Sequence, residues 1–329
     1  MRLRRHPAAA IAGALSCAGA LIAGTVPLAA GAQAAPAASM AAAPYIYFGW
    51  GNPQSPTQVM SATGVRWFTL AFILSDGGCN PKWDGDRSLT GSDAAKIQGI
   101  RAAGGDVIPS FGGWSGAKLG QRCSSASALA NAYQKVIDAY RLKAIDIDIE
   151  AGEFSSGTVR KRVVDALKIV KDRNPGITVY VTFGTTPTGP DSTGKDLIRK
   201  GAAAGVEVDG WVIMPFDYGA SPGDMGDASI KAANGLKNAV KSAYGYSDDQ
   251  AYRHIGISSM NGKDDDGRTI SKGDFQDMLA YAQQHHLARF TFWAVNRDRS
   301  CGSGSDGDSC SGIKQQPLDF TKIIAQYHR

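Results

Sequence analysis

The chain has 329 residues, of which 43% are hydrophobic and 20% charged, with a formal net charge of +5. This composition is ordinary for a globular protein, and the length is ample for a large buried core. Arg2, Arg4 and Arg5 account for three of the 35 basic residues, which leaves 32 against 30 acidic residues after residue 44, a balance that argues against a nucleic-acid or membrane-surface partner.

The first predicted element is a secretory signal peptide over residues 1–34. A basic start, MRLRRHP, precedes an apolar, alanine-rich run and the small-residue cleavage pattern Ala32-Gln33-Ala34, which is the order of segments in such a peptide. A membrane anchor is the alternative, but the apolar run is short for a bilayer span. We therefore expect a secreted, extracellular protein, with a short linker over residues 35–44 and one domain over residues 45–329.

Four cysteines follow the signal peptide: Cys79, Cys123, Cys301 and Cys310. An even number in an oxidising compartment favours disulfides, and a metal site is disfavoured because the sequence has no CxxC pair. Cys301 and Cys310 bound a loop rich in glycine, serine and aspartate, so we expect them to pair. That pairing leaves Cys79 for Cys123.

From residue 45 onward, strand-like and helix-like segments alternate. Strands are expected over residues 45–50, 66–74, 106–114, 143–150, 177–183, 208–218, 253–260 and 289–295, and helices over 93–104, 126–142, 157–174, 194–205, 228–245, 271–286 and 318–329. Eight such units in about 285 residues predict an α/β fold, a (β/α)₈ TIM barrel. An open doubly wound sheet is the alternative, but no GxGxxG motif follows the first strand.

The segment AIDIDIEAGEF, residues 144–154, places three acids on one face of the fourth strand, because side chains alternate along a strand. In a parallel barrel one face packs on helices and the other fills the interior. The isoleucines suit the helix layer, so Asp146, Asp148 and Glu150 should point inward, with Glu150 at the C-terminal mouth. Crowding should raise the pKa of at least one of them, which favours a functional site. A divalent metal held by the three carboxylates is the alternative.

These residues, with other strand ends, resemble glycoside hydrolase family 18, the retaining chitinases and endo-β-N-acetylglucosaminidases. AIDIDIE is similar to the family's DxDxE core, SFGG (110–113) to its third-strand SxGG segment, and MPFDY (214–218) to its sixth-strand Met-x-Tyr-Asp motif. Trp293 resembles the eighth-strand tryptophan that floors the −1 sugar site. The resemblance covers essentially the whole chain after the signal peptide.

Three positions depart from the family pattern. Lys143 stands where the longer motif has aspartate, and Ile149 where an aromatic residue commonly precedes the acid. Phe216 replaces the tyrosine whose hydroxyl helps to hold the substrate's acetamido group. Tyr218, two residues later, is the candidate to replace that hydroxyl.

The resemblance implies a substrate-assisted, retaining glycosidase without a metal or another cofactor. Glu150 would be the general acid, Asp148 would orient the acetamido group, and Asp146 would exchange a proton with Asp148. The expected substrate contacts are Met214, Asp217, Tyr218, Trp293 and Trp114.

Other conspicuous residues allow two interpretations each. Trp50, Trp83 and Trp114 lie at or near strand ends, where they could line a sugar site or pack within loops. The acidic run at residues 264–266 is expected to be a solvated loop.

The leading hypothesis is a secreted chitinase, a monomer that cuts β-1,4-linked N-acetylglucosamine in chitin or chito-oligosaccharides. An endo-β-N-acetylglucosaminidase acting on N-glycans, or a peptidoglycan hydrolase, is the alternative within the same chemistry. A chitin-binding lectin on an inactive barrel is a different class, and it is disfavoured because Glu150 is present.

Overall fold

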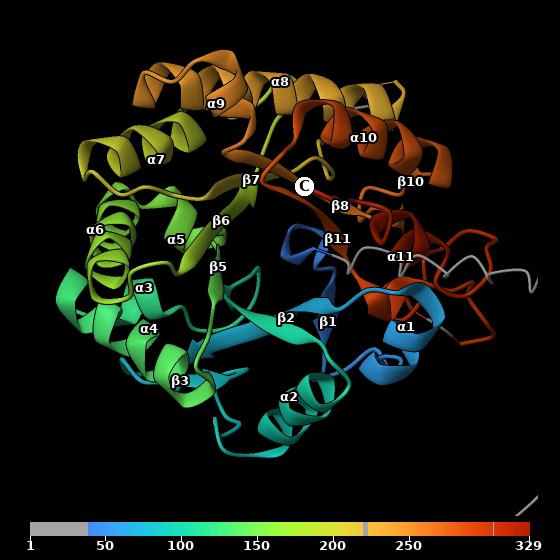
Figure 1. Ribbon diagram of the computed structural model, residues 1–329, viewed down its shortest axis with the longest axis horizontal. Helices are drawn as coiled ribbons and strands as arrows, with labels where there is room; N and C mark the ends of the chain where they lie inside the picture. The colour runs from blue at the N-terminus through green and yellow to red at the C-terminus, as the bar shows by residue number, and fades with distance from the viewer. Residues whose placement is uncertain (1–38, 220–222, 305) are drawn as a thin grey trace, which may run out of the picture. The chain divides into compact units, whose positions relative to one another are not determined.

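The structure is a computed structural model that describes residues 39–219, 223–304 and 306–329. The predicted signal peptide lies outside the described residues. Strands stand in the middle of the ribbon and helices surround them (Figure 1). The predicted (β/α)₈ barrel is confirmed.

The barrel strands follow one another in chain order around the ring, each hydrogen-bonded in parallel to the next. A short strand, β3 (Pro81–Trp83), pairs antiparallel with the second of them. The eight barrel strands are β1 (Tyr45–Tyr47), β2 (Trp67–Ser75), β4 (Asp106–Gly112), β5 (Ala144–Asp148), β6 (Thr178–Gly184), β7 (Gly210–Met214), β8 (Ile255–Met260) and β11 (Arg289–Trp293).

Side chains close the seam between β1 and β11. The Asn296 amide accepts a hydrogen bond from the Tyr47 N–H at 2.9 Å and donates one to the Tyr47 carbonyl at 2.9 Å. At the other end of β1, the Ala43 carbonyl accepts from the hydroxyls of Thr69 and Thr291 at 2.9 and 2.5 Å. These bonds satisfy buried backbone groups of β1 and of Ala43, two residues before it. Ala43 was expected to be linker, but it is fully buried beneath the barrel.

Helices form the outer layer because each carries an apolar stripe. In α6 (Gly157–Arg173), Val163, Leu167 and Val170 recur at helical spacing and are fully buried. The other long helices are α1 (Pro56–Thr63), α2 (Ser92–Ala102), α4 (Ala126–Tyr140), α7 (Ser192–Ala203), α8 (Met225–Tyr244), α10 (Lys272–His285) and α11 (Asp319–Ile324). The shorter elements are α3 (Leu119–Arg122), α5 (Ala151–Ser155), α9 (Asp248–Tyr252), the 3₁₀ turns η1 (Met40–Ala42) and η2 (Val295–Arg297), and the hairpin β9 (Gly262–Lys263)–β10 (Thr269–Ile270).

Helix α1 was not predicted, although its start and stop signals are present. Pro56 stands in its first turn and Gly64 follows its last residue in the left-handed conformation. Its eight residues carry only two buried side chains, so the periodic signal is weak. Among the described residues, no helix combines the length and the apolar character needed to cross a bilayer.

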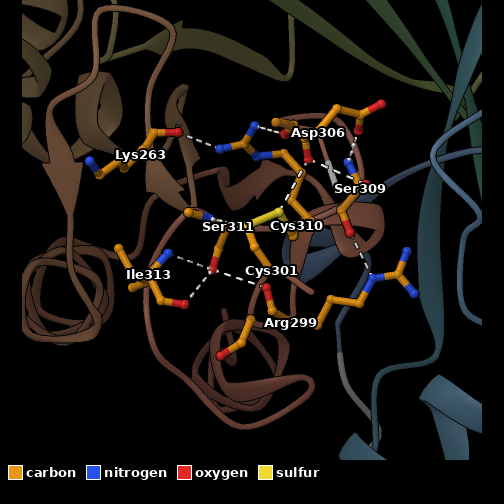
Figure 2. The surroundings of a disulfide bond; sticks show 12 residues. Lys263, Arg299, Cys301, Asp306, Ser309, Cys310, Ser311 and Ile313 are labelled. Atoms are coloured by element: carbon orange, nitrogen blue, oxygen red, sulfur yellow. Dashed lines mark hydrogen bonds between the residues drawn. A yellow bond between two sulfur atoms is a disulfide. The ribbon is translucent and has the colours of Figure 1, made fainter. Parts of the chain in front are cut away.

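Two disulfides link loops that follow barrel strands, and both form between the cysteines predicted to pair. Cys79–Cys123 connects the loops after β2 and β4, and Cys301–Cys310 closes the loop after β11. Figure 2 shows the second bond, where the Arg299 carbonyl accepts the Ser311 N–H at 3.0 Å.

Removing Cys79–Cys123 should destabilise the fold more than removing Cys301–Cys310. The bonded cysteines are 44 and 9 residues apart, respectively, and closing those loops in the unfolded chain is worth about 4 and about 3 kcal/mol. Urea unfolding of the two double Cys→Ala variants measures the free energies. An equal or reversed order would contradict the loop-closure account.

Candidate active site

The three predicted acids lie along β5 and just beyond its end. Asp146 and Asp148 are 0% and 3% exposed inside the barrel, whereas Glu150 is partly exposed and precedes the first residue of α5. The strand ends at Asp148, two residues earlier than predicted. Glu150 therefore stands at the C-terminal mouth, where the alternation placed it.

The SFGG segment lets β4 approach this acidic strand closely. Gly112 has a φ of +113°, and a Cβ at that position would collide with the Asp148 carbonyl. Gly113 has a φ of +85°, and its Cβ would lie 2.8 Å from the Phe72 ring. The Gly113 N–H donates to the Asp148 carbonyl at 2.9 Å. The two glycines thus fix the backbone around Asp148 at a distance that no other residue permits.

Asp146 has hydrogen bonds to both carboxylate oxygens. Ser110 and Tyr45 donate to Oδ2 at 2.6 and 2.8 Å, and Thr182 donates to Oδ1 at 2.7 Å. The guanidinium of fully buried Arg289 lies 4.0 Å from Oδ1. Three side-chain donors and the Arg289 guanidinium therefore hold Asp146 in place at the base of the acidic stack.

Asp148 has the opposite environment. Its Oδ1 is buried and has no hydrogen-bond partner among the described residues. Burial, followed by the charges of Glu150 and Asp146, raises the pKa of Asp148 well above its ordinary value, and the Lys118 and Arg289 cations offset this only in part. The surroundings of Asp148 thus favour the neutral form of its side chain over the charged form.

Glu150 combines access to the mouth with a raised pKa. Burial is the main cause, the Asp217 charge adds to it, and the Lys118 cation opposes it, which leaves the pKa of Glu150 at about 7. Such a group can give up a proton and take it back near neutral pH, as a general acid–base must.

Besides Arg289, two buried charged residues beside the acids escaped the sequence analysis. Lys118 is 2% exposed, and its positive charge acts on Asp148, Glu150 and Glu153. Glu153 lies on α5, is 3% exposed and accepts the Gly120 N–H at 2.7 Å. Both occupy a loop or a one-turn helix, where no periodic pattern separates a buried charge from an exposed one.

Glu153→Gln should make stability less dependent on pH. Burial raises the pKa of Glu153 from 4.5 to about 7 in the folded protein. The folded state therefore favours the neutral acid, and this stabilisation is full below pH 4.5 and is lost as pH rises through about 7, with a span of about 3 kcal/mol. Urea unfolding should show the variant gaining stability over wild type at pH 9 but not at pH 4. Exposed Glu207→Gln is the control, and an equal gain there would contradict the explanation.

Aromatic rings surround the predicted sugar-binding tryptophan. Trp293, at the end of β11, stacks on Phe72 with ring centroids 5.6 Å apart and planes 13° apart. Its centroid lies 6.0 Å from that of Tyr45, whose hydroxyl holds Asp146, so the rings adjoin the acidic stack. Trp50 extends the group, with its centroid 6.5 Å from Trp293 and 45% of its surface exposed.

The MPFDY segment brings only some of its predicted contacts to the mouth. Met214 ends β7 and is partly buried, and the charge of exposed Asp217 helps to raise the pKa of Glu150. The Tyr218 hydroxyl is buried beside Ser229 of α8. The structure therefore does not support Tyr218 as a sugar contact, and the hydroxyl absent at Phe216 is not replaced from there.

The remaining tryptophans differ in exposure. Trp114, in the loop after β4, is 74% exposed and open to a ligand. Trp83 is fully buried, and its indole N–H donates to the Tyr140 hydroxyl at 2.8 Å. Trp83 is thus a packing residue and not part of a sugar site.

The acidic run at residues 264–266 is not the solvated loop that we predicted. Asp264 is buried in the turn of the β9–β10 hairpin. Carboxylate oxygens of Asp217, Asp264 and Asp266 lie within 4.8 Å of one another, and Arg268 forms ion pairs with the latter two. The run is buried in part because it contacts the loop that carries Asp217.

The similar proteins found by comparison are chitinases. No family model matches the chain. Active domain 2 of the thermostable chitinase from Pyrococcus furiosus, solved as catalytic-site mutants with chito-oligosaccharides, is 30% identical, with a TM-score of 0.78 over 86% of this chain and 93% of that chain.

Two curated relatives are similar at lower identity. The probable bifunctional chitinase/lysozyme of Escherichia coli K12 is 27% identical over 305 residues, which is 87% of this chain and 34% of that protein. Endochitinase 11 of Metarhizium anisopliae is 27% identical over 271 residues, which is 78% of this chain and 52% of that protein. The chain thus spans about a third to a half of the length of these relatives.

Proposed function

Because the chain belongs to the same family as the catalytic domain of the Pyrococcus furiosus chitinase, we propose that it is a retaining chitinase of glycoside hydrolase family 18. The observation that carries the proposal is the acidic stack of β5, in which a glutamic acid with a pKa of about 7 stands at the mouth beyond a buried aspartic acid whose pKa is also raised. The substrate is β-1,4-linked N-acetylglucosamine in chitin or chito-oligosaccharides.

In the proposed mechanism, the substrate supplies the nucleophile. The acetamido carbonyl oxygen attacks the anomeric carbon while the glycosidic bond breaks, and Glu150 gives its proton to the departing oxygen. Asp148 holds the acetamido N–H, and it becomes the counter-ion of the oxazolinium intermediate when its proton moves to Asp146. Ionised Glu150 then takes a proton from the water that opens the intermediate. Trp293 stacks on the sugar and Asp217 binds it.

Secretion and the monomeric state belong to the same proposal. The basic, apolar and small-residue segments of residues 1–34 support export. Two disulfides suit an oxidising compartment.

The rate should fall on the alkaline side of neutrality. Glu150 must be protonated to act as the acid, and its pKa is about 7 in the free protein. We therefore expect kcat/KM to be high below about pH 7 and to fall about tenfold per pH unit well above it. A profile that rises through pH 8 would contradict the assignment of Glu150 as the acid.

Product analysis on three substrates tests the function. We expect the protein to release short N-acetylglucosamine oligomers from chito-oligosaccharides, and to act much more slowly on an N-glycoprotein or on peptidoglycan. Cleavage of the N-glycoprotein alone would favour the endo-β-N-acetylglucosaminidase alternative. Binding to chitin oligomers without hydrolysis would indicate a lectin.

A further inference from the structure

The β9–β10 hairpin and the loop after β7 are joined by reciprocal hydrogen bonds. The Asp217 N–H donates to Asp264 Oδ2 at 3.2 Å, and the Gly219 N–H donates to Asp266 Oδ2 at 2.9 Å. In the opposite direction, the Asp265 N–H donates to Asp217 Oδ1 at 2.8 Å. The contact therefore fixes both the backbone and the carboxylate of Asp217.

Arg268 offsets part of the negative charge in this contact. Three carboxylates this close repel one another, and the Arg268 guanidinium lies 3.2 Å from Asp264 and also pairs with Asp266. The Asp264 side chain is fully buried, and its Oδ1 accepts the Arg268 N–H at 2.7 Å. Asp264 and Arg268 thus hold the turn of the hairpin as well as its partner loop.

The backbone of Asp217 shows why such a contact is needed. Its φ is +49°, in the left-handed region that residues other than glycine rarely adopt. A residue stays in that region when its surroundings determine the conformation. The hydrogen bonds to its N–H and its carboxylate supply that constraint.

The hairpin itself is hydrogen-bonded to residues on either side of the Cys301–Cys310 loop. The Lys263 N–H donates to the Ser311 carbonyl at 2.7 Å, and the Arg297 guanidinium donates to the Lys263 carbonyl. Figure 2 shows the hydrogen bond to the Lys263 carbonyl among the surroundings of the disulfide. The hydrogen bonds next to the disulfide therefore fix the position of the hairpin.

We propose that Asp264 and Arg268 are positioning residues for Asp217, so that the hairpin presents the Asp217 carboxylate to the bound sugar and to Glu150. The role given to Asp217 rests on the proposed function, whereas the contact between hairpin and loop does not. Neither Asp264 nor Arg268 touches the sugar in this account.

Asp264→Asn is the main test, because it keeps the shape of the side chain and removes the charge that pairs with Arg268. We expect kcat/KM on a soluble chito-oligosaccharide to fall about 10- to 100-fold, as a misplaced binding group does. The alkaline limb of the pH profile should move to lower pH, because the displaced Asp217 charge no longer raises the pKa of Glu150. Thr269→Ala, exposed on the same hairpin, is the matched control and should keep wild-type values.

A double-mutant cycle separates positioning from general stability. In an Asp217→Ala background, Asp264→Asn should change kcat/KM less than twofold. An equal fall with and without Asp217 would overturn the proposal. Asp266→Asn, at the more exposed end of the contact, gives the same comparison if Asp264→Asn folds poorly.

Amide hydrogen exchange tests the contact without any assay of activity. Asp264→Asn should speed exchange at the N–H groups of Asp217 and Asp265, while those of β7 stay protected. Unchanged exchange at both amides would overturn the proposal. If the wild-type protein proved inactive on chito-oligosaccharides, the proposed function would fail, and the exchange result would still decide whether the hairpin positions Asp217.

Discussion

Glu150→Gln leaves the barrel folded and lowers kcat on an unactivated chito-oligosaccharide by at least about 10²-fold, the usual scale for loss of a general acid. The reason lies in the position of Glu150, which stands at the mouth with a pKa of about 7. Glutamine matches its size but has no proton to give to the glycosidic oxygen. Initial rates of oligomer cleavage measure the loss, and Glu207→Gln, an exposed change of the same kind, should keep wild-type rates.

The leaving group distinguishes acid catalysis from substrate binding. A substrate with a nitrophenol leaving group needs little protonation, so Glu150→Gln should slow its cleavage much less than that of the natural oligomer. The thermal unfolding midpoint of the Glu150→Gln variant should equal or exceed that of the wild-type protein, because burial penalises a charged carboxylate at this position. Near-normal turnover of the unactivated oligomer would show that Glu150 is not the acid.

Much of the fold followed from alternation along the strands. The period of two in residues 144–150 predicted which acids are buried inside the barrel, and the structure buries Asp146 and Asp148 there. The alternation of side chains along a strand also applies to β11, where we did not use it. Residues 289, 291 and 293 share one face of β11, so placing Trp293 inside also places Arg289 inside. The arginine beneath Asp146 was therefore predictable from the sequence.

The contacts made by loops were not predictable in this way. Asp217 and Asp264 are 47 residues apart, and their contact depends on two turns whose geometry no periodic pattern encodes. A run of three aspartates is predicted to be exposed to solvent, because each charge is costly to bury alone. Here the cost is offset by Arg268 and by backbone N–H groups from a distant loop. Such compensation is visible only once the chain has folded.

The same limit applies to Tyr218, the candidate to replace the hydroxyl missing at Phe216. Counting along MPFDY placed a hydroxyl two residues from the one that is missing at Phe216. The chain turns at Pro215, which cannot donate a ladder hydrogen bond, and Asp217 has a positive φ. The alternation of the strand therefore ends at Met214, and Tyr218 turns toward α8.

Removing the acetamido group from the cleaved sugar should abolish hydrolysis more completely than any single substitution. If the acetamido oxygen is the nucleophile, a substrate with a free amine at that one sugar loses the reacting group itself. Intramolecular nucleophiles have effective molarities of about 10⁵ M or more, so we expect kcat/KM to fall at least about 10³-fold. An oligomer with the same amine at a sugar that is not cleaved is the matched control and should fall far less.

The anomer of the first product decides between this mechanism and its rival. An inverting enzyme needs a second carboxylate across the sugar to activate water. Asp146 and Asp148 are stacked below Glu150 on one strand, and both carboxylate oxygens of Asp146 accept hydrogen bonds from protein side chains. Among the acids assigned to this site, only Asp217 could act as the base that activates water. It follows a different strand and has a pKa of about 6. Proton NMR of a fresh digest should show the β-anomer first, with later mutarotation to α. An initial α-anomer would assign the base to Asp217 and refute substrate assistance, even with Glu150 essential.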